Sequence, residues 1–179
     1  ECGGLMKHIG SGTQKVEEEL HELFPGVEVL RMDADTVSGN HEQLLEKFEK
    51  KKIPILLGTQ MVAKGLNLEN VTLVGVISPD QMLWSGDYRA QERTFNLITQ
   101  VVGRSGRGNK AGRAVIQTWT PENEIILQAA RQDYDAFYRQ EILTRQALKA
   151  PPFADQLVFR FGGTEEHAAQ QAAQAFAQA

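Results

Sequence analysis

Two nearly uninterrupted apolar stretches decide the fold: IPILL over residues 53–57, which ends at Gly58, and VTLVGVI over residues 71–77. A strand that is apolar at successive positions, rather than at every second position, is typical of burial on both faces, as in a parallel sheet. We therefore expect both stretches to be strands of a parallel sheet.

Strand and helix patterns alternate on either side of these stretches. Further strands are expected at 5–9, 27–32 and 114–119. The helical spacing of apolar residues predicts helices over 13–24, 42–52, 89–102, 122–132 and 134–147. The order of these elements predicts an α/β fold with an open, mainly parallel sheet flanked by helices.

A domain boundary is predicted at Pro151-Pro152, so residues 5–150 form the main domain. Beyond the boundary, residues 156–161 have a strand pattern and residues 165–178 are rich in the helix formers Ala and Gln. One strand and one helix are too few to fold alone. We therefore expect residues 151–179 to be the truncated start of a further domain.

Composition excludes several classes of protein. Of 179 residues, 41% are apolar and 23% charged, which is ordinary for a soluble globular chain. No apolar run approaches the roughly 20 residues that cross a bilayer, and the N-terminus lacks the features of a signal peptide. The single cysteine excludes an internal disulfide framework and fits a reducing, intracellular setting. The missing initiator Met leads us to expect a piece of a longer protein.

Charge is distributed unevenly along the chain. The net charge of −4 argues against a chain that binds nucleic acid over its whole surface. Between Asp87 and Arg113, however, six basic residues stand against two acidic ones, a net charge of +4. A local excess of guanidinium groups is best explained by a phosphate-bearing ligand.

The sequence QVVGRSGRG over residues 100–108 concentrates this charge at the end of a predicted helix. Arg104 and Arg107 are three positions apart, so on a helical turn they point the same way. Gly103 and Gly106 carry no side-chain bulk and allow a ligand to approach the backbone closely. The pattern indicates a polyanion site, and a solvated arginine-rich helix end is the alternative.

A phosphate cradle is missing from the sequence. No Gly-rich loop has the Walker A pattern, and no apolar strand ends in an acidic pair. Asp33 and Asp35 follow a strand and are candidates for a metal site, but a solvated role in a polar loop is favoured. We therefore expect a second lobe to hold the nucleotide while this chain supplies an arginine finger, which is worth about 10³ to 10⁵ in rate.

The residues after the first apolar strand, GTQMVAKG over 58–65, form a second candidate site. Ligands of open α/β sheets bind beyond the carboxyl ends of strands. Thr59, Gln60 and Lys64 offer a hydroxyl, an amide and a point charge that suit a sugar-phosphate backbone. The alternative is a purely structural turn from strand to helix.

Four stretches together resemble a known family. They are GSGTQKVEEELHELFPGVEVLRMDADT (10–36), GTQMVAKGLNLENVTLVGV (58–76), DYRAQERTFNLITQVVGRSGRGNKAGRAVIQTWTPEN (87–123) and APPF (150–153). The second and third are similar to motifs V and VI of superfamily 2 helicases. More narrowly, the set resembles the PriA family of bacterial replication-restart DNA helicases.

The resemblance implies the second RecA-like lobe of an ATP-dependent helicase that moves 3′ to 5′ on branched or single-stranded DNA. It implies that primosome proteins and single-strand-binding proteins are partners. It also implies a location in the bacterial cytoplasm, at the nucleoid, without membrane contact. ATP and Mg²⁺ would be held mainly by the missing lobe, so this chain alone is expected to be inactive.

The resemblance also assigns roles to residues of this sequence. Arg107 is the stronger candidate for the arginine finger and Arg104 the other. Gln100, Gly103 and Gly65 fall on the nucleotide side. The residues implied to contact DNA are Thr59, Gln60 and Lys64.

The resemblance also implies a zinc-binding origin for Cys2. The family inserts a zinc-binding segment with paired C-x-x-C units into this lobe, and Cys2-Gly3-Gly4 matches its last cysteine. Residues 1–4 would then be a remnant of that segment. Because a tetrahedral zinc site needs four ligands and one is present, we expect no zinc in this chain.

Two alternatives to the family assignment stay open. One is a different superfamily 2 translocase, such as a transcription–repair coupling or branch-migration enzyme, and the other is a non-catalytic interaction module on the same fold. Of the two tryptophans, Trp119 is interpreted as a core residue. For Trp84, packing is favoured over stacking on a base.

Overall fold

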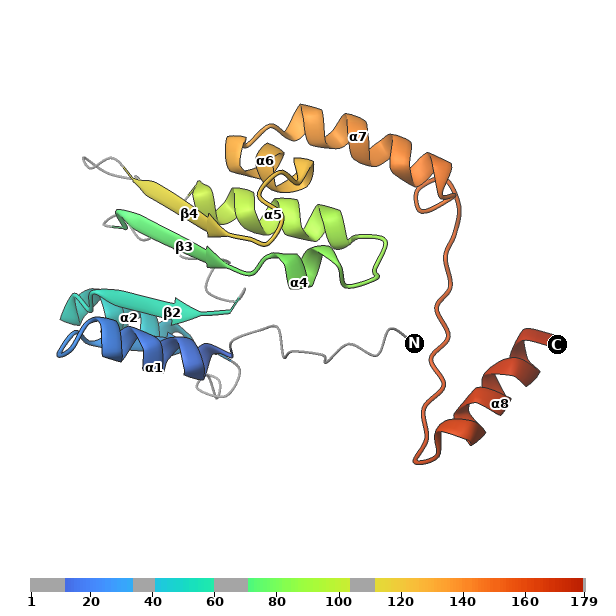
Figure 1. Ribbon diagram of the computed structural model, residues 1–179, viewed down its shortest axis with the longest axis horizontal. Helices are drawn as coiled ribbons and strands as arrows, with labels where there is room; N and C mark the ends of the chain where they lie inside the picture. The colour runs from blue at the N-terminus through green and yellow to red at the C-terminus, as the bar shows by residue number, and fades with distance from the viewer. Residues whose placement is uncertain (1–11, 34–40, 60–70, 104–111, 179) are drawn as a thin grey trace. The chain divides into compact units, whose positions relative to one another are not determined.

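The computed structural model of the protein describes residues 12–33, 41–59, 71–103 and 112–178. The predicted strand at 5–9 lies outside these residues. The chain divides into two compact units, residues 1–141 and 142–179, and one helix, α7, runs from the first into the second (Figure 1). The domain boundary at Pro151-Pro152 stays a prediction.

Helices and strands alternate as the sequence predicts. The helices are α1 (Thr13–Leu23), α2 (His41–Lys51), α4 (Asp80–Leu83), α5 (Ala90–Val102), α6 (Glu124–Arg131), α7 (Tyr134–Ala147) and α8 (Glu166–Gln178). The strands are β1 (Val29–Met32), β2 (Ile55–Gly58), β3 (Leu73–Ile77) and β4 (Arg113–Gln117). The short helix α4 falls in a stretch that the sequence patterns left without an element.

Both strand pairs are parallel, which confirms the predicted α/β class. β1 pairs with β2 from Val29↔Ile55 onward, and β3 pairs with β4 from Leu73↔Arg113 to Ile77↔Gln117. Among the described residues these pairs form two separate two-stranded sheets. In each pair the carboxyl ends of both strands lie at one edge, as parallel pairing requires.

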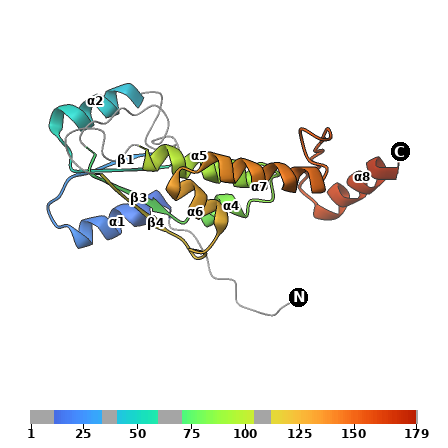
Figure 2. The same cartoon turned by 90° about the horizontal axis from the view of Figure 1, so that it is seen from above.

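Two helices pack against β1, and Figure 2 shows α1 and α2 on opposite sides of it. A polar cluster ties α1 to the strand. Arg31 pairs with Glu17 at 2.9 Å and with Asp33 at 3.1 Å, and the Thr13 hydroxyl donates to Asp33. Asp33 is buried, so its interpretation as a solvated loop residue is wrong. The ion pair and the hydroxyl satisfy the carboxylate inside the fold. Asp35 lies outside the described residues.

The β3–β4 pair is covered on one face. Val76 is buried and Ile116 packs on the core, whereas Leu73, Ile77 and Val115 are 61%, 52% and 45% exposed. The prediction that β3 is buried on both faces is therefore wrong for the described residues. Successive side chains alternate between the two faces, and α5 contacts the strands from one of them.

The main core lies where α5, α6 and α7 meet. Phe95 and Ile98 of α5 are fully buried, as the helical spacing predicts, and Val102 packs beside them. The ring of Phe95 stacks on that of Phe137 with a centroid distance of 4.1 Å. Burying side chains of this size contributes about 2 kcal/mol each, so this contact holds α5 firmly in place.

In the second unit, the predicted strand at residues 156–161 is wrong. Residues 156–161 are not a strand, because none of the described strands pairs with them. Instead, Phe159 and Phe161 place their rings against Phe176 of α8, with centroid distances of 4.5 and 5.6 Å. The apolar residues at positions 159 and 161 therefore pack against a helix and do not belong to a sheet. The predicted helix at 165–178 is confirmed as α8.

Candidate nucleotide and nucleic-acid interface

The predicted site residues divide into two groups. Thr59, Gln100 and Gly103 belong to the described part of the chain. The others lie outside it: Cys2, Gln60, Lys64, Gly65, Arg104 and Arg107. For these residues the assigned roles stay predictions. The described residues nevertheless show how the segment that carries the two arginines begins and ends.

Helix α5 delivers that segment to one edge of the β3–β4 pair. The chain leaves the carboxyl end of β3, passes through α4 and returns along the strands as α5, as Figure 1 shows. It then enters β4 at Arg113, which pairs with Leu73, the first residue of β3. The described chain resumes at residue 112, and β4 begins at the amino edge of the pair. Gln100, in the last turn of α5, is exposed.

Gly103 ends α5 at a point of close approach. Its N–H donates to the Thr99 carbonyl at 3.0 Å, and its φ of −67° is one that any residue adopts. A Cβ at this position would lie 3.4 Å from Nε2 of Gln132 and 3.2 Å from the Thr99 oxygen. An added side chain would therefore press on the Thr99 carbonyl and touch the end of the Gln132 side chain, so glycine suits this tight approach.

Gln132 reaches this place because it ends α6 in the left-handed conformation, with a φ of +57°. Its backbone N–H donates to the Ala129 carbonyl at 3.1 Å. This conformation reverses the chain between α6 and α7. Sequence reasoning did not find Gln132, since its role depends on how α6 packs against α5.

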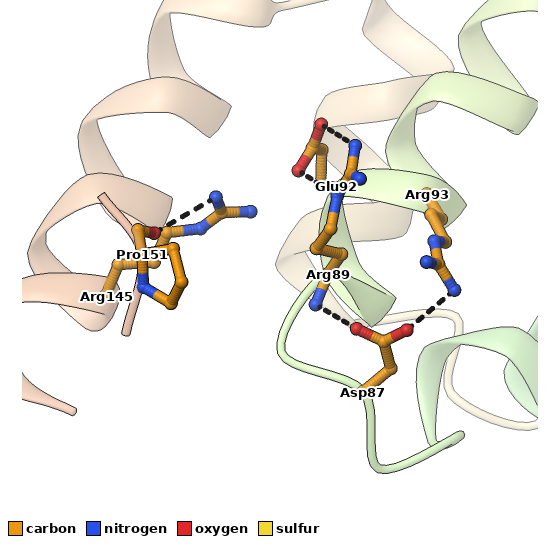
Figure 3. A network of polar contacts seen from close by, with 6 residues as sticks. All are labelled: Asp87, Arg89, Glu92, Arg93, Arg145 and Pro151. Atoms are coloured by element: carbon orange, nitrogen blue, oxygen red, sulfur yellow. Dashed lines mark hydrogen bonds and ion pairs between the residues drawn. The ribbon is translucent and has the colours of Figure 1, made fainter. Parts of the chain in front are cut away.

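The opposite end of α5 pairs its charges internally (Figure 3). Arg93 contacts Asp87 at 2.7 Å, and Arg89 contacts Glu92 at 3.3 Å. Asp87 also accepts a hydrogen bond from the backbone N–H of Arg89 at 2.9 Å. These two arginines thus match the two acidic residues of the cationic stretch. The net charge of +4 between residues 87 and 113 therefore belongs to residues 104–113.

A second polar centre lies at the carboxyl edge of the β3–β4 pair. Asp80 is 7% exposed and accepts hydrogen bonds from the Thr118 hydroxyl at 2.8 Å, the Thr120 hydroxyl at 3.1 Å and the Trp119 N–H at 3.4 Å. Burial by itself raises the pKa of Asp80. The hydrogen bonds, with that from Thr118 the strongest, outweigh burial and hold the pKa below its ordinary value.

Both tryptophans are exposed at this edge. Trp119 is 75% exposed and Trp84 is 68% exposed, so the interpretation of Trp119 as core and the preference for packing of Trp84 are both wrong. Trp119 lies two residues beyond the end of β4, and its backbone N–H, not its indole, contacts Asp80. The pattern T-x-T after β4 was the available signal for this polar centre.

Thr59 directly follows Gly58, the last residue of β2, and is exposed. Its place at the carboxyl end of a parallel strand agrees with the prediction from the strand pattern. Among the described residues, no three His, Cys, Asp or Glu side chains gather where they could hold a metal ion. None of the helices in the described ranges is long and apolar enough to cross a membrane.

Comparison with known proteins matches the motifs. The family profile of the helicase conserved C-terminal domain matches residues 9–109. The replication restart protein PriA of Bacillus subtilis is 49% identical over 86% of this chain and 19% of its own length. PriA of Synechocystis is 42% identical over 99% of the chain and 22% of its own length, and PriA of Chlamydia pneumoniae 46% over 86% and 21%.

The chain spans about a fifth of the length of these curated relatives. The matched range contains both candidate segments, residues 58–65 and residues 100–108. The resemblance inferred from the sequence motifs is confirmed, and the chain belongs to the family of helicase conserved C-terminal domains.

Proposed function

We propose that this chain is the second motor lobe of an ATP-dependent 3′-to-5′ DNA helicase that restarts stalled replication forks and assembles the primosome. The observation that carries the proposal is the helicase C-terminal profile over residues 9–109, which spans both candidate loops. The similarity to replication restart proteins over most of the chain supports the fork-restart assignment over transcription–repair coupling or branch migration.

In this proposal the segment after Gly103 reaches the nucleotide. Arg107, with Arg104 beside it, neutralises the charge that develops on the transferring phosphoryl group. The cationic excess of residues 104–113 fits a triphosphate. In the same proposal, Gln100, Gly103 and Gly65 lie on the side of the lobe that faces the nucleotide.

The remaining ligands are proposals of the same kind. ATP and Mg²⁺ are held mainly by the first lobe, so the chain by itself does not hydrolyse ATP. Zinc belongs to the full-length protein, because Cys2 offers one thiolate where a tetrahedral site needs four ligands. Thr59, Gln60 and Lys64 contact the backbone of branched or single-stranded DNA. Primosome and single-strand-binding proteins are the partners, in the cytoplasm at the nucleoid.

The test is Arg107→Ala in the intact protein. We expect the kcat of DNA-stimulated ATP hydrolysis to fall by about 10³ to 10⁵, since a finger contributes this much to the phosphoryl transition state. DNA binding should be retained. Arg93→Ala is the matched control, because Arg93 is already paired with Asp87 and should keep most of the activity.

Unchanged ATP hydrolysis in Arg107→Ala would overturn the finger role. Binding to DNA at several salt concentrations distinguishes the proposal from a non-catalytic interaction module. If phosphates are contacted, the logarithm of the affinity falls linearly with the logarithm of the salt concentration. Absence of salt-sensitive DNA binding in the unmodified protein would favour the module.

A further inference from the structure

The carboxyl edge of the β3–β4 pair presents two exposed indoles on a rigid base. The backbone N–H of Trp119 donates to the Asp80 carboxylate, and the backbone N–H of Trp84 donates to the Asp80 carbonyl at 3.0 Å. Tryptophan is usually well buried, yet these side chains are 75% and 68% exposed. One buried residue thus anchors the backbone from which both rings project.

A cavity of about 120 Å³ lies beside one of these rings, lined by Ser78, Gln117, Thr118 and Trp119. Ser78 has a φ of +51°, a conformation that side-chain-bearing residues rarely adopt, and its N–H donates to the Gln117 carbonyl at 3.0 Å. Such backbone geometry concentrates at ligand-binding positions. The cavity therefore combines an aromatic face with an amide and two hydroxyl groups.

This combination suits a planar ring with hydrogen-bonding edges, which is the chemistry of a nucleobase. The indole supplies a stacking face, and the side-chain amide of Gln117 and the Ser78 hydroxyl can donate and accept at the ring edge, whereas the Thr118 hydroxyl donates to Asp80. Stacking on an aromatic residue tolerates every base, because each base has a π-face. A protein that moves along DNA needs contacts of this kind, which do not read the sequence.

The cavity lies at the edge of the β3–β4 pair where both strands end. Trp119 follows the carboxyl end of β4, whereas β4 begins at the amino end, where Arg113 pairs with Leu73. The five residues of β4 span about 16 Å between these edges. The indole therefore lies at the edge of the pair opposite to the one at which β4 begins.

We infer that Trp119 stacks on a base of a single DNA strand that crosses the carboxyl edge of the β3–β4 pair, with the side chains of Gln117 and Ser78 at the edge of that base. The inference rests on the proposed function insofar as DNA is the polymer that this lobe follows. It adds a base contact to the backbone contacts proposed for the loop after β2.

The test compares Trp119→Ala, Trp119→Phe and the unmodified intact protein on two single strands, oligo(dT) and an abasic strand of equal length. Trp119→Ala should raise the Kd for oligo(dT) by about 5- to 150-fold, the effect of losing one stacked base. Trp119→Phe should restore most of the affinity. On the abasic strand all three proteins should bind alike. Tyr138→Ala, which removes an exposed aromatic side chain on α7, is the matched control.

Each other outcome overturns the inference in a distinguishable way. Equal loss on both strands would mean that Trp119 acts through the fold. A raised KM for ATP with unchanged DNA affinity would assign the ring to adenine. If neither the Kd for DNA nor the KM for ATP changes, the exposed indole would instead be assigned to contact with a protein partner. If the unmodified protein binds no DNA, the proposed function fails; if it binds DNA and Trp119→Ala has no effect, the base contact alone fails.

Discussion

The two edges of the β3–β4 pair hold charge in opposite ways. Near the carboxyl edge three acidic groups are engaged: Asp80 accepts three hydrogen bonds, and Asp87 and Glu92 pair with the arginines that begin α5. At the amino edge the chain becomes cationic. The sequence holds no acidic residue between Glu92 and Glu122, and four basic residues lie within residues 104–113.

The difference shows that arginine has two roles between residues 87 and 113: near a carboxylate it forms a local ion pair, and elsewhere it is a candidate for ligand binding. An arginine three to six positions from a carboxylate becomes part of the scaffold, because the pair forms within the same turn or two of helix. No acidic residue lies within six positions of Arg104 or Arg107, so a local pair of this kind is not available to them. The contrast is open to three tests beyond those of the finger and the base contact.

The largest effect is expected at the carboxyl edge, from Asp80→Asn. Loss of the carboxylate that serves three donors should lower the free energy of unfolding by about 1–3 kcal/mol at pH 7, measured by urea denaturation. Because the pKa of Asp80 is lowered in the fold, its contribution is full above about pH 4, the unfolded value. It is lost as the pH falls through the folded value.

The difference in stability between the unmodified protein and Asp80→Asn should therefore shrink below about pH 4. Glu28→Gln, at an exposed carboxyl, is the control and should change the stability by less than about 0.5 kcal/mol. A gap between the two proteins that stays constant down to pH 2 would show that the charge of Asp80 does not matter.

A smaller effect is expected at the amino edge, from Gly103→Ala. The added Cβ lies 3.4 Å from the Gln132 amide, and crowding of this kind costs about 1 kcal/mol. In a Gln132→Gly background, which suits the φ of +57° and removes the side chain, the same change should be neutral or should stabilise by about 0.4–1 kcal/mol. A double-mutant cycle measures the coupling. Identical effects in both backgrounds would show that the two residues do not interact.

The smallest effect is expected from Arg93→Ala, measured as stability. Its pair with Asp87 is solvent-exposed, with 53% and 32% of the side chains accessible, and such pairs contribute about 0.2–1 kcal/mol. The loss should become smaller still in concentrated salt, which screens the unmodified pair. A loss of several kcal/mol that is insensitive to salt would mean that the start of α5 depends on Arg93 for more than this pair.

Periodicity predicted most of the helices because it reports the face that a helix buries. The bounds of α7 agree with the structure, and the stripe through Phe95 and Ile98 faces the core as expected. Strands are less well determined by pattern. The alternation at 156–161 fits a strand equally well, but a strand exists only if another strand pairs with it, and this information is not local.

The candidate site divides in the same way. The position of the arginine segment at a helix end follows from the sequence, as does the exposure of Thr59 after β2. The centre around Asp80 could not be predicted, because it joins residues 38 to 40 positions apart. The same holds for Gln132, which reaches Gly103 from another helix. The exposure of Trp119 could not be predicted either. A tryptophan at a strand end has the same sequence pattern whether tertiary packing covers it or leaves it exposed.

The bonds of Asp80 have an architectural consequence. They fasten the beginning of the excursion through α4 and α5 to the end of β4, so the chain between residues 80 and 120 is a closed loop with both ends secured. Doubling the length of such a loop costs only about 0.6 kcal/mol of closure entropy. Residues added between α5 and β4 should therefore cost little closure entropy, because the parallel pairing of β3 with β4 and the bonds of Asp80 do not depend on the length of the chain between them.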